Sequence, residues 1–245
     1  MRIATWNLES YSKLTPAREV ALRQAMAEVK ADVWVLTETW LDFSPGAGYK
    51  LVAQSFGAVD LKKWPKRCWV EIWVKSNLDA RRLEVRKCSD RMACGRIENP
   101  GQRDVVVVGT VLPWFGDELF PAADDFCKAL KGQVADWGLW GSPRTSGFIF
   151  AGDFNQSLPY QKDYGSKKGA NALNTAFKTH NLLCLTEGNN PLTGIPRIDH
   201  ICISPSSLQP LRTPPAGTWA VPAVGGKPIT DHSGAYGDLD LPDFS

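Results

Sequence analysis

The stretch Phe148-Ile149-Phe150-Ala151-Gly152-Asp153-Phe154-Asn155-Gln156-Ser157-Leu158 decides how the rest of the chain is interpreted. Its first four residues are apolar and predict a buried strand that stops at Gly152. Because side chains alternate along an extended chain, Asp153 and Asn155 leave the strand end on the same side. Pro159 prevents a helix from following directly. A carboxylate and a carboxamide aimed together would suit a phosphate and its attacking water, whereas an Asx turn is the purely structural alternative.

The composition is that of an ordinary soluble protein. The chain has 245 residues, of which 43% are hydrophobic and 22% charged, which is enough for a sizeable core. The net charge of +2 makes no case for nucleic acid by itself, because such binders usually concentrate Lys and Arg. No apolar run approaches the roughly 20 residues that a membrane-spanning helix needs. The N-terminal residues Arg2–Asn7 resemble a strand and lack a signal peptide's apolar core, so we expect a cytoplasmic protein.

The cysteines agree with a reducing setting. None belongs to a Cys-x-x-Cys pair, and several lie within apolar strand patterns, as buried free thiols often do. The six are Cys68, Cys88, Cys94, Cys127, Cys184 and Cys202. A disulfide between Cys88 and Cys94 stays open as an alternative.

The chain alternates many short apolar runs with few helical patterns. The predicted strands are Arg2–Asn7, Val33–Thr37, Leu51–Ser55, Cys68–Val74, Val105–Val111, Phe148–Gly152, Leu183–Thr186, Ile198–Ile203 and Tyr236–Leu239, with Leu83–Arg86 as a further candidate. Helices are expected from Pro16 to about Val29, over Pro121–Trp137 and over Asn171–His180. There is no composition break, long linker or repeat. We therefore predict one α+β domain over residues 1–245, built of stacked layers.

Polar side chains recur where the predicted strands end. They are Asn7, Glu38, Asp153 with Asn155, Asp199, and Asp231 with His232. One strand-end acid alone is usually a cap or turn residue, but five such ends in one chain suggest a common site. Four converging carboxylates would repel one another and shift each other's pKa. A hard divalent cation relieves that repulsion, and oxygen ligands point to Mg²⁺ or Mn²⁺.

These residues also resemble a known family. The segments Trp6-Asn7, Thr37-Glu38, Gly152-Asp153-Phe154-Asn155, Arg197-Ile198-Asp199-His200 and Thr230-Asp231-His232 occur in the order found in the endonuclease/exonuclease/phosphatase superfamily. That superfamily includes DNase I and the exonuclease III type of abasic-site nuclease. The resemblance spans residues 2 to about 240. It implies a DNase I-like four-layer α/β/β/α sandwich, with the site at one mouth of the two packed sheets.

The resemblance also implies a metal site. Glu38 would be the principal ligand of Mg²⁺ or Mn²⁺, with Asn7 beside it, and Asp231 would complete or extend the site.

The catalytic roles that the resemblance implies fall on four further residues. Asp153 would orient and deprotonate the attacking water, and Asn155 would hold a phosphoryl oxygen. His232 would contact the scissile phosphate, with Asp199 fixing its ring and favouring its charged form. In-line phosphodiester hydrolysis needs these functions: a positioned water, neutralised phosphoryl oxygens and help for the leaving oxygen.

One segment departs from the family pattern. Many relatives have a His or Tyr at the end of the strand that corresponds to Val105–Leu112, but this chain reads Thr110-Val111-Leu112-Pro113. A second acid or phosphate donor is therefore missing, or Trp114, Asp117 or a residue elsewhere replaces it. The consequence would be a different leaving-group requirement, a slower enzyme or lost activity.

Other polar residues are interpreted as structural or peripheral. His180 and His200 are expected to be structural, because His200 faces the opposite side from Asp199. The basic loop Lys62–Arg67, near Trp69, could bind nucleic acid but more simply is a solvated loop whose tryptophans pack inward. A second basic loop, Lys162–Lys168, should lie near the site. The cluster Arg81, Arg82, Arg86, Lys87, Arg91 and Arg96 is expected to lie mostly on the surface.

The predicted function is a Mg²⁺-dependent phosphodiesterase, most plausibly a nuclease that acts on DNA or RNA. Two alternatives remain: an enzyme for a small or lipid-linked phosphate ester, and a non-catalytic relative that binds nucleic acid or a protein.

Overall fold

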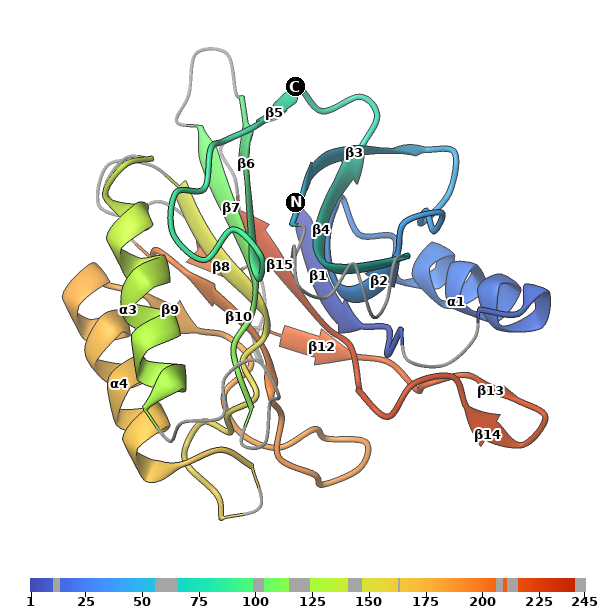
Figure 1. Ribbon diagram of the computed structural model, residues 1–245. Coiled ribbons are helices and arrows are strands. Elements are labelled where there is room, and N and C mark those ends of the chain that lie inside the picture. Colours follow the sequence, from blue (N-terminus) through green and yellow to red (C-terminus); the bar gives the residue numbers. More distant parts are fainter. Residues whose placement is uncertain are drawn as a thin grey trace.

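The computed structural model describes residues 1–10, 14–55, 66–98, 104–114, 124–140, 147–162, 164–205, 209–210 and 216–240. Two β-sheets pack face to face, and helices cover the outer face of each sheet (Figure 1). Among the described helices, none is long and apolar enough to cross a membrane.

The first sheet, sheet A, contains both ends of the described chain. Its strand order is β11-β15-β1-β2-β4-β3, and β12 pairs with β15 outside that order. The strands are β1 (Arg2–Asn7), β2 (Val33–Trp40), β3 (Tyr49–Gln54), β4 (Arg67–Lys75), β11 (Gln209–Pro210), β12 (Ala216–Thr218) and β15 (Ala235–Asp240). A small hairpin of β13 (Ala223–Val224) and β14 (Lys227–Pro228) lies apart from this sheet.

The second sheet, sheet B, has the order β5-β6-β7-β8-β10-β9. Its strands are β5 (Ala80–Arg82), β6 (Met92–Ile97), β7 (Val105–Val111), β8 (Gly147–Asp153), β9 (Leu183–Cys184) and β10 (Asp199–Ile203). In Figure 1, α3 (Asp125–Trp137) and α4 (Lys167–His180) cover its outer face, whereas α1 (Pro16–Val29) covers the outer face of sheet A.

Three hydrophobic clusters hold the four layers together, one between each pair of adjacent layers. Val105 and Val107 point into the cluster between the two sheets, whereas Val106 and Val108 point into the cluster under α3 and α4. The third cluster joins sheet A to α1 through residues such as Leu22. Because β7 is buried on both faces, apolar residues follow one another from Val105 to Val108 and do not alternate with polar residues. The predicted α/β/β/α sandwich is confirmed.

The element boundaries correct several predictions. Leu83–Arg86 is not a strand: β5 ends at Arg82, and the backbone N–H groups of Arg86 and Lys87 donate to the Asp136 carboxylate and not to a neighbouring strand. Helix α4 begins at Lys167, four residues before the prediction, because the Ser166 side chain accepts a hydrogen bond from the backbone N–H of Gly169. Cys88 and Cys94 are both free thiols.

Strand β6 was absent from the prediction. Its sequence, Met92–Ile97, contains Gly95 and few β-branched residues, so its strand propensity is low. A Cβ atom on Gly95 would lie 2.9 Å from Val52 Cγ1 in the opposite sheet. The glycine thus permits close approach of the two sheets, and tertiary packing determines the strand.

Candidate active site

The strand register brings the predicted strand-end residues together. Strands β1 and β2 are parallel, with Asn7 opposite Thr37, so that Glu38 follows directly beside Asn7. In sheet B, the antiparallel pairing of β8 and β10 places Asp199 opposite Asp153. The Asn7 side-chain amide joins the two sheets: Nδ2 donates to Glu38 Oε1 at 3.2 Å and to Asp153 Oδ2 at 2.9 Å.

Asp153 is a buried carboxylate at the centre of this arrangement. Its Oδ1 accepts from the backbone N–H of Asn155 at 2.8 Å, and its Oδ2 accepts from the amides of Asn7 and Asn155. Burial raises the pKa of Asp153 to about 7, with His232 opposing the rise and Asp199 and Glu38 adding to it. A carboxylate whose pKa lies near neutrality can take a proton from water at physiological pH.

The backbone around Asp153 adopts conformations that few residues tolerate. Gly152 has a φ of +136°, and a Cβ atom there would lie 2.0 Å from the carbonyl oxygen of Thr110. Asn155 has a φ of +48° and Glu38 a φ of +49°. Such non-glycine residues in the left-handed region cluster at functional sites, where the surrounding structure holds them in place.

The Asn155 amide is already engaged. Nδ2 donates to the Leu112 carbonyl at 2.9 Å and to Asp153 Oδ2 at 3.2 Å. Since both partners only accept hydrogen bonds, the orientation of the amide is determined. A contact between this amide nitrogen and a phosphoryl oxygen would require one of these bonds to open, so the phosphate contact of Asn155 stays a prediction.

His232 lies beside the two carboxylates of sheet B. Its Nδ1 is 2.7 Å from Asp199 Oδ2, and the pair is largely buried. Burial would lower the pKa of His232, but Asp199, Asp153 and Asp231 together raise it well above its ordinary value. The ring is therefore held in its charged form, which can donate a proton or hydrogen bond to phosphate.

The loop that carries His232 is tied to β1. The Thr230 hydroxyl donates to the carbonyl of Asn7 and accepts from the backbone N–H of His232, while Trp6 Nε1 donates to the His232 carbonyl. These bonds place the histidine relative to Asn7, even though more than 220 residues separate the two in sequence.

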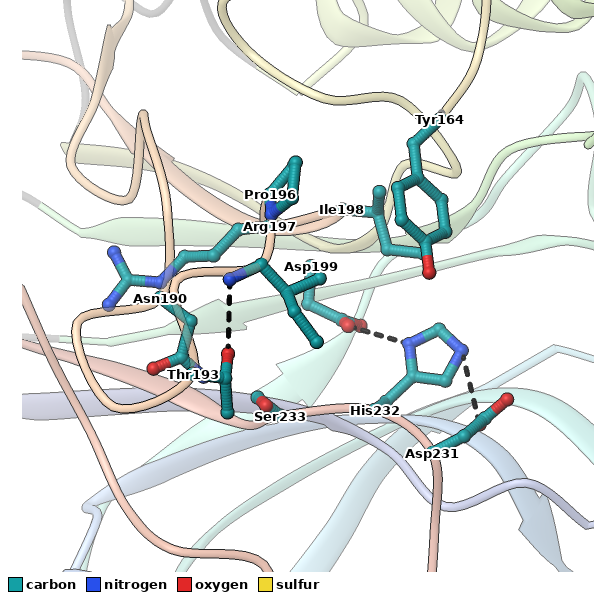
Figure 2. A pocket seen from close by; sticks show the side chains of 11 residues that line it. Tyr164, Asn190, Thr193, Pro196, Arg197, Ile198, Asp199, Asp231, His232 and Ser233 are labelled. Carbon is teal, nitrogen blue, oxygen red and sulfur yellow. Dashed lines mark hydrogen bonds and ion pairs between the residues drawn. The ribbon is translucent and has the colours of Figure 1, made fainter. Parts of the chain in front are cut away.

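A pocket opens next to His232 (Figure 2). Figure 2 shows the imidazole between the carboxylates of Asp199 and Asp231, and Asp231 Oδ1 lies 3.7 Å from its Nε2. The residues that line this pocket include Tyr164, which is 40% exposed, and Ile195, which is 53% exposed. Tyr164 belongs to the basic loop predicted to lie near the site. Lys168, which was expected in the same loop, lies in the first turn of α4 and pairs with Asp124.

Sequence reasoning missed a buried ion pair at this site. Arg67 Nη2 lies 2.8 Å from Glu38 Oε2, and each side chain is 5% exposed. Arg67 was expected in a solvated loop, whereas the structure makes it the first residue of β4, paired with Trp40 across the sheet. An arginine directly before an apolar, tryptophan-bearing strand is the only sequence signal for this contact. Residues 62–65 of the loop lie outside the described residues.

Two arginines and two tryptophans pack beside the ion pair. The guanidinium carbons of Arg67 and Arg91 lie 3.5 and 3.7 Å from the Trp69 ring centroid, and Trp114 stands 6.3 Å from Trp69. The surface expectation was wrong for Arg91, which is 2% exposed. Trp114, one of the candidates to replace the missing His or Tyr, therefore contacts a cationic cluster. Asp117, the other candidate, lies outside the described residues.

The donor atoms of the site fit a hard divalent cation. Buried carboxylates and carboxamides supply oxygen, and no thiolate is among the site residues that the structure describes. Atoms of Asp153, Asp199 and His232 lie within 4.8 Å of one another, close enough to share an ion. Glu38 and Asn7, with Asp231, stay the predicted metal residues. Hydrogen bonding does not separate the two sets, because Asp199 pairs with His232 and Glu38 accepts from Asn7 and Arg67.

Two histidines lie away from this arrangement. His180, on α4, packs edge-on against Trp137. His200 is fully buried and faces the opposite side of β10 from Asp199, where it contacts Thr186 and the carbonyl of Gln156.

Comparisons with known proteins agree with the fold. The sequence model of the Endonuclease/Exonuclease/phosphatase family matches residues 4–232, and the chain belongs to this family. Members of the family are typically phosphoric ester hydrolases and generally use divalent metal ions. No curated protein matches the chain.

Solved structures show the same fold. D. rerio TDP2 complexed with single-strand DNA product has a TM-score of 0.66 at 14% identity, covering 98% of this chain and 99% of that one. The AP endonuclease LMAP from Leishmania major has a TM-score of 0.67 at 16% identity, covering 96% and 86%. The human Nocturnin catalytic domain with bound sulfate has a TM-score of 0.69 at 12% identity, covering 99% and 94%.

Proposed function

We propose that the protein is a divalent-metal-dependent phosphodiesterase, and specifically a nuclease that hydrolyses DNA or RNA. One observation carries the proposal: a single amide, that of Asn7, bridges the buried carboxylates of Glu38 and Asp153. Beside them stands a histidine that Asp199 keeps charged. Hydrolysis of a phosphoester requires two such groups, a general base and a cationic donor close to it.

Each residue has a role in this proposal. Asp153 accepts a proton from the attacking water, and the amides of Asn7 and Asn155 hold its carboxylate in place. Charged His232, oriented by Asp199, donates to the scissile phosphate or its leaving oxygen. Glu38 with Asn7, extended by Asp231, would hold Mg²⁺ or Mn²⁺, which supplies charge neutralisation for the phosphoryl oxygens.

The pocket beside His232 supports a nucleotide as the substrate. Tyr164 offers an aromatic face, and Ile195 and Pro196 offer apolar surface in the same pocket as His232. A base or sugar attached to the scissile phosphate would bury its apolar surface there, because bases stack on aromatic side chains. The DNA product in the TDP2 complex belongs to a protein with the same fold and is consistent with this choice.

The low net charge of +2 favours the second candidate, a small or lipid-linked phosphate ester. A polynucleotide substrate differs from such an ester in its salt dependence, because each phosphate contact releases counterions. A nuclease should lose activity steeply as salt rises, whereas hydrolysis of a small ester should change little.

The test compares supercoiled plasmid, a single-stranded oligonucleotide and bis(p-nitrophenyl) phosphate, each with Mg²⁺, Mn²⁺ or EDTA at two salt concentrations. We expect metal-dependent cleavage of the nucleic acids with a steep fall at the higher salt. Cleavage of the chromogenic ester alone would overturn the nuclease assignment and favour a small phosphate ester as the substrate. Tight nucleic-acid binding without turnover in any metal would favour a non-catalytic relative and overturn the proposal.

A further inference from the structure

A pair of cysteines faces the helical layer at the edge of sheet B. Cys184 on β9 lies directly opposite Cys202 on β10. In the adjacent pair, the backbone N–H of Leu185 donates to the Ile201 carbonyl at 2.8 Å. Hydrogen-bonded and non-hydrogen-bonded pairs alternate in an antiparallel ladder, so Cys184 and Cys202 form a non-hydrogen-bonded pair. In such a pair the Cα atoms lie about 4.5 Å apart, within the range of disulfides.

His200 is placed to take a proton from Cys184. Its Nε2 lies 3.0 Å from the carbonyl of Gln156, which only accepts, so this nitrogen carries the hydrogen. In the neutral ring Nδ1 is then an acceptor, and it faces the Cys184 sulfur at 3.6 Å and the Thr186 hydroxyl at 3.1 Å. The hydrogen bond from Cys202 lowers the pKa of Cys184 well below its ordinary value; burial opposes this, and His200 lowers it further.

Cys184 also borders a second pocket. It is half-buried, and the pocket is formed with the C-terminal end of α4 and the segment that follows it. Phe177 and Leu182 supply an apolar wall, and Lys178 supplies a positive charge. Cys202, by contrast, is fully buried behind it. Of the two thiols, Cys184 is therefore the one next to the pocket, and a small reagent that enters the pocket would reach it first.

We propose that Cys184 is a reactive thiolate that peroxide oxidises, and that Cys202 is the thiol that resolves the product into a disulfide. The Cys184 thiolate attacks one peroxide oxygen, the O–O bond breaks, and hydroxide leaves and takes the His200 proton. Cys184 is then a sulfenic acid. The Cys202 sulfur attacks it, the S–OH bond breaks, and water leaves with the Cys202 proton. Two thiols lose two electrons, and one peroxide is reduced to two waters.

This site is separate from the phosphoester chemistry. Cys184, Cys202 and His200 lie on the face of β10 opposite Asp199, and none of the three contacts Asp153 or His232 among the described interactions. Oxidation of Cys184 therefore does not require the proposed nuclease activity.

The test treats the native full chain with hydrogen peroxide, blocks remaining thiols with N-ethylmaleimide, and maps peptides by mass spectrometry without reduction. We expect a Cys184–Cys202 linked peptide that dithiothreitol reverses. Cys127, a half-buried thiol on α3, is the internal control. Cys184 should be oxidised at least about tenfold faster than Cys127, because the thiolate is the reactive form.

Two variants sharpen the assignment. In Cys202→Ser the sulfenic acid cannot be resolved, so dimedone should label Cys184, whereas Cys184→Ser should abolish the fast reaction. Circular dichroism checks that both variants fold, and the linked peptide of the wild type decides the matter if they do not. Oxidation of Cys184 no faster than Cys127, or a fast reaction that leaves no Cys184–Cys202 link in the wild type, would overturn the proposal.

Discussion

Arg67 and Glu38 form an ion pair inside the candidate active site, with 2.8 Å between Arg67 Nη2 and Glu38 Oε2. Asn7 donates to the other carboxylate oxygen, so both oxygens of Glu38 have hydrogen-bond donors. Glu38 is also the predicted principal metal ligand. The guanidinium therefore supplies positive charge at the carboxylate where a cation is expected, and Arg67 and the metal act on the same group.

Replacing Arg67 tests this relationship. In Arg67→Ala, Glu38 is left buried without its charge partner, which typically costs about 3–5 kcal/mol of unfolding free energy. Added Mg²⁺ should restore part of the loss, because it supplies the missing charge. Urea unfolding in EDTA and in Mg²⁺ measures both effects. Lys66→Ala is the matched control, since Lys66 pairs with Asp42 and both side chains are 76% exposed. Equal stability of the two variants in EDTA would contradict the account.

The Asp199–His232 hydrogen bond should set the alkaline limit of activity. Burial alone would lower the pKa of His232, and Asp199 is the leading group that raises it well above its ordinary value. In Asp199→Asn the histidine should lose its proton at lower pH. The alkaline limb of the kcat/KM profile should then move toward neutrality. At pH 8, kcat/KM of the variant should be roughly 10²-fold below that of the wild type. In Asp231→Asn the limb should move less, because Asp231 is 76% exposed. An unchanged limb in Asp199→Asn would show that His232 is not the acid.

Gly152 should resist any side chain. Its φ of +136° and the 2.0 Å approach of a Cβ atom to the Thr110 carbonyl make alanine unfavourable there. We expect Gly152→Ala to lose at least about 2 kcal/mol of unfolding free energy. Gly138→Ala is the control: Gly138 has a φ of −66°, with open space around it, so alanine should be neutral or slightly stabilising. Equal urea midpoints for the two variants would count against the described strand end.

The buried carboxyl group of Glu71 should make the free energy of unfolding depend on pH. Burial raises its pKa from the ordinary 4.5 to about 7, with the hydrogen bond from Trp73 opposing the rise. Between these values the unfolded chain releases the proton while the folded protein keeps it, so stability falls as pH rises. Glu71→Gln stays neutral, so it should match the wild type below pH 4.5 and exceed it above pH 7 by about 3 kcal/mol. Parallel unfolding curves for the two proteins, with a constant offset from pH 4 to 8, would refute this.

The strand ends were predictable because they depend on local sequence. Asp153 follows four apolar residues and a glycine, and His232 follows an aspartate, so each carries its own signal. The contacts that organise them were not predictable. Arg67 reaches Glu38 only because β4 pairs with β2 and places Arg67 opposite Trp40. Burial of Arg91 likewise depends on Trp69 and Trp114, which arrive from other strands or their ends.

The fold shows the same division. Strand β7 was predicted because all seven of its residues are buried and five are valine. Strand β6 was not predicted, because it contains Gly95, which is needed there for the close approach of Val52 in the opposite sheet. The apparent strand at Leu83–Arg86 is apolar in part, and Leu83 still donates to the Cys94 carbonyl of β6. The N–H groups of Arg86 and Lys87 donate instead to Asp136 of α3. Local patterns thus predict elements with two buried faces, and they fail where a distant side chain determines the backbone.

The most direct test of the account is single-turnover cleavage of a labelled oligonucleotide by the wild type, Asp153→Asn and His180→Ala in Mg²⁺. Asparagine has nearly the shape of aspartate but cannot accept the water's proton. The single-turnover cleavage rate of Asp153→Asn should therefore be roughly 10³-fold lower than that of the wild type. His180 lies on α4 against Trp137, so its replacement should leave cleavage within about twofold of the wild type, as expected for a residue outside the site. Full activity in Asp153→Asn, or wild-type cleavage that persists in EDTA, would contradict a metal-dependent hydrolysis centred on Asp153.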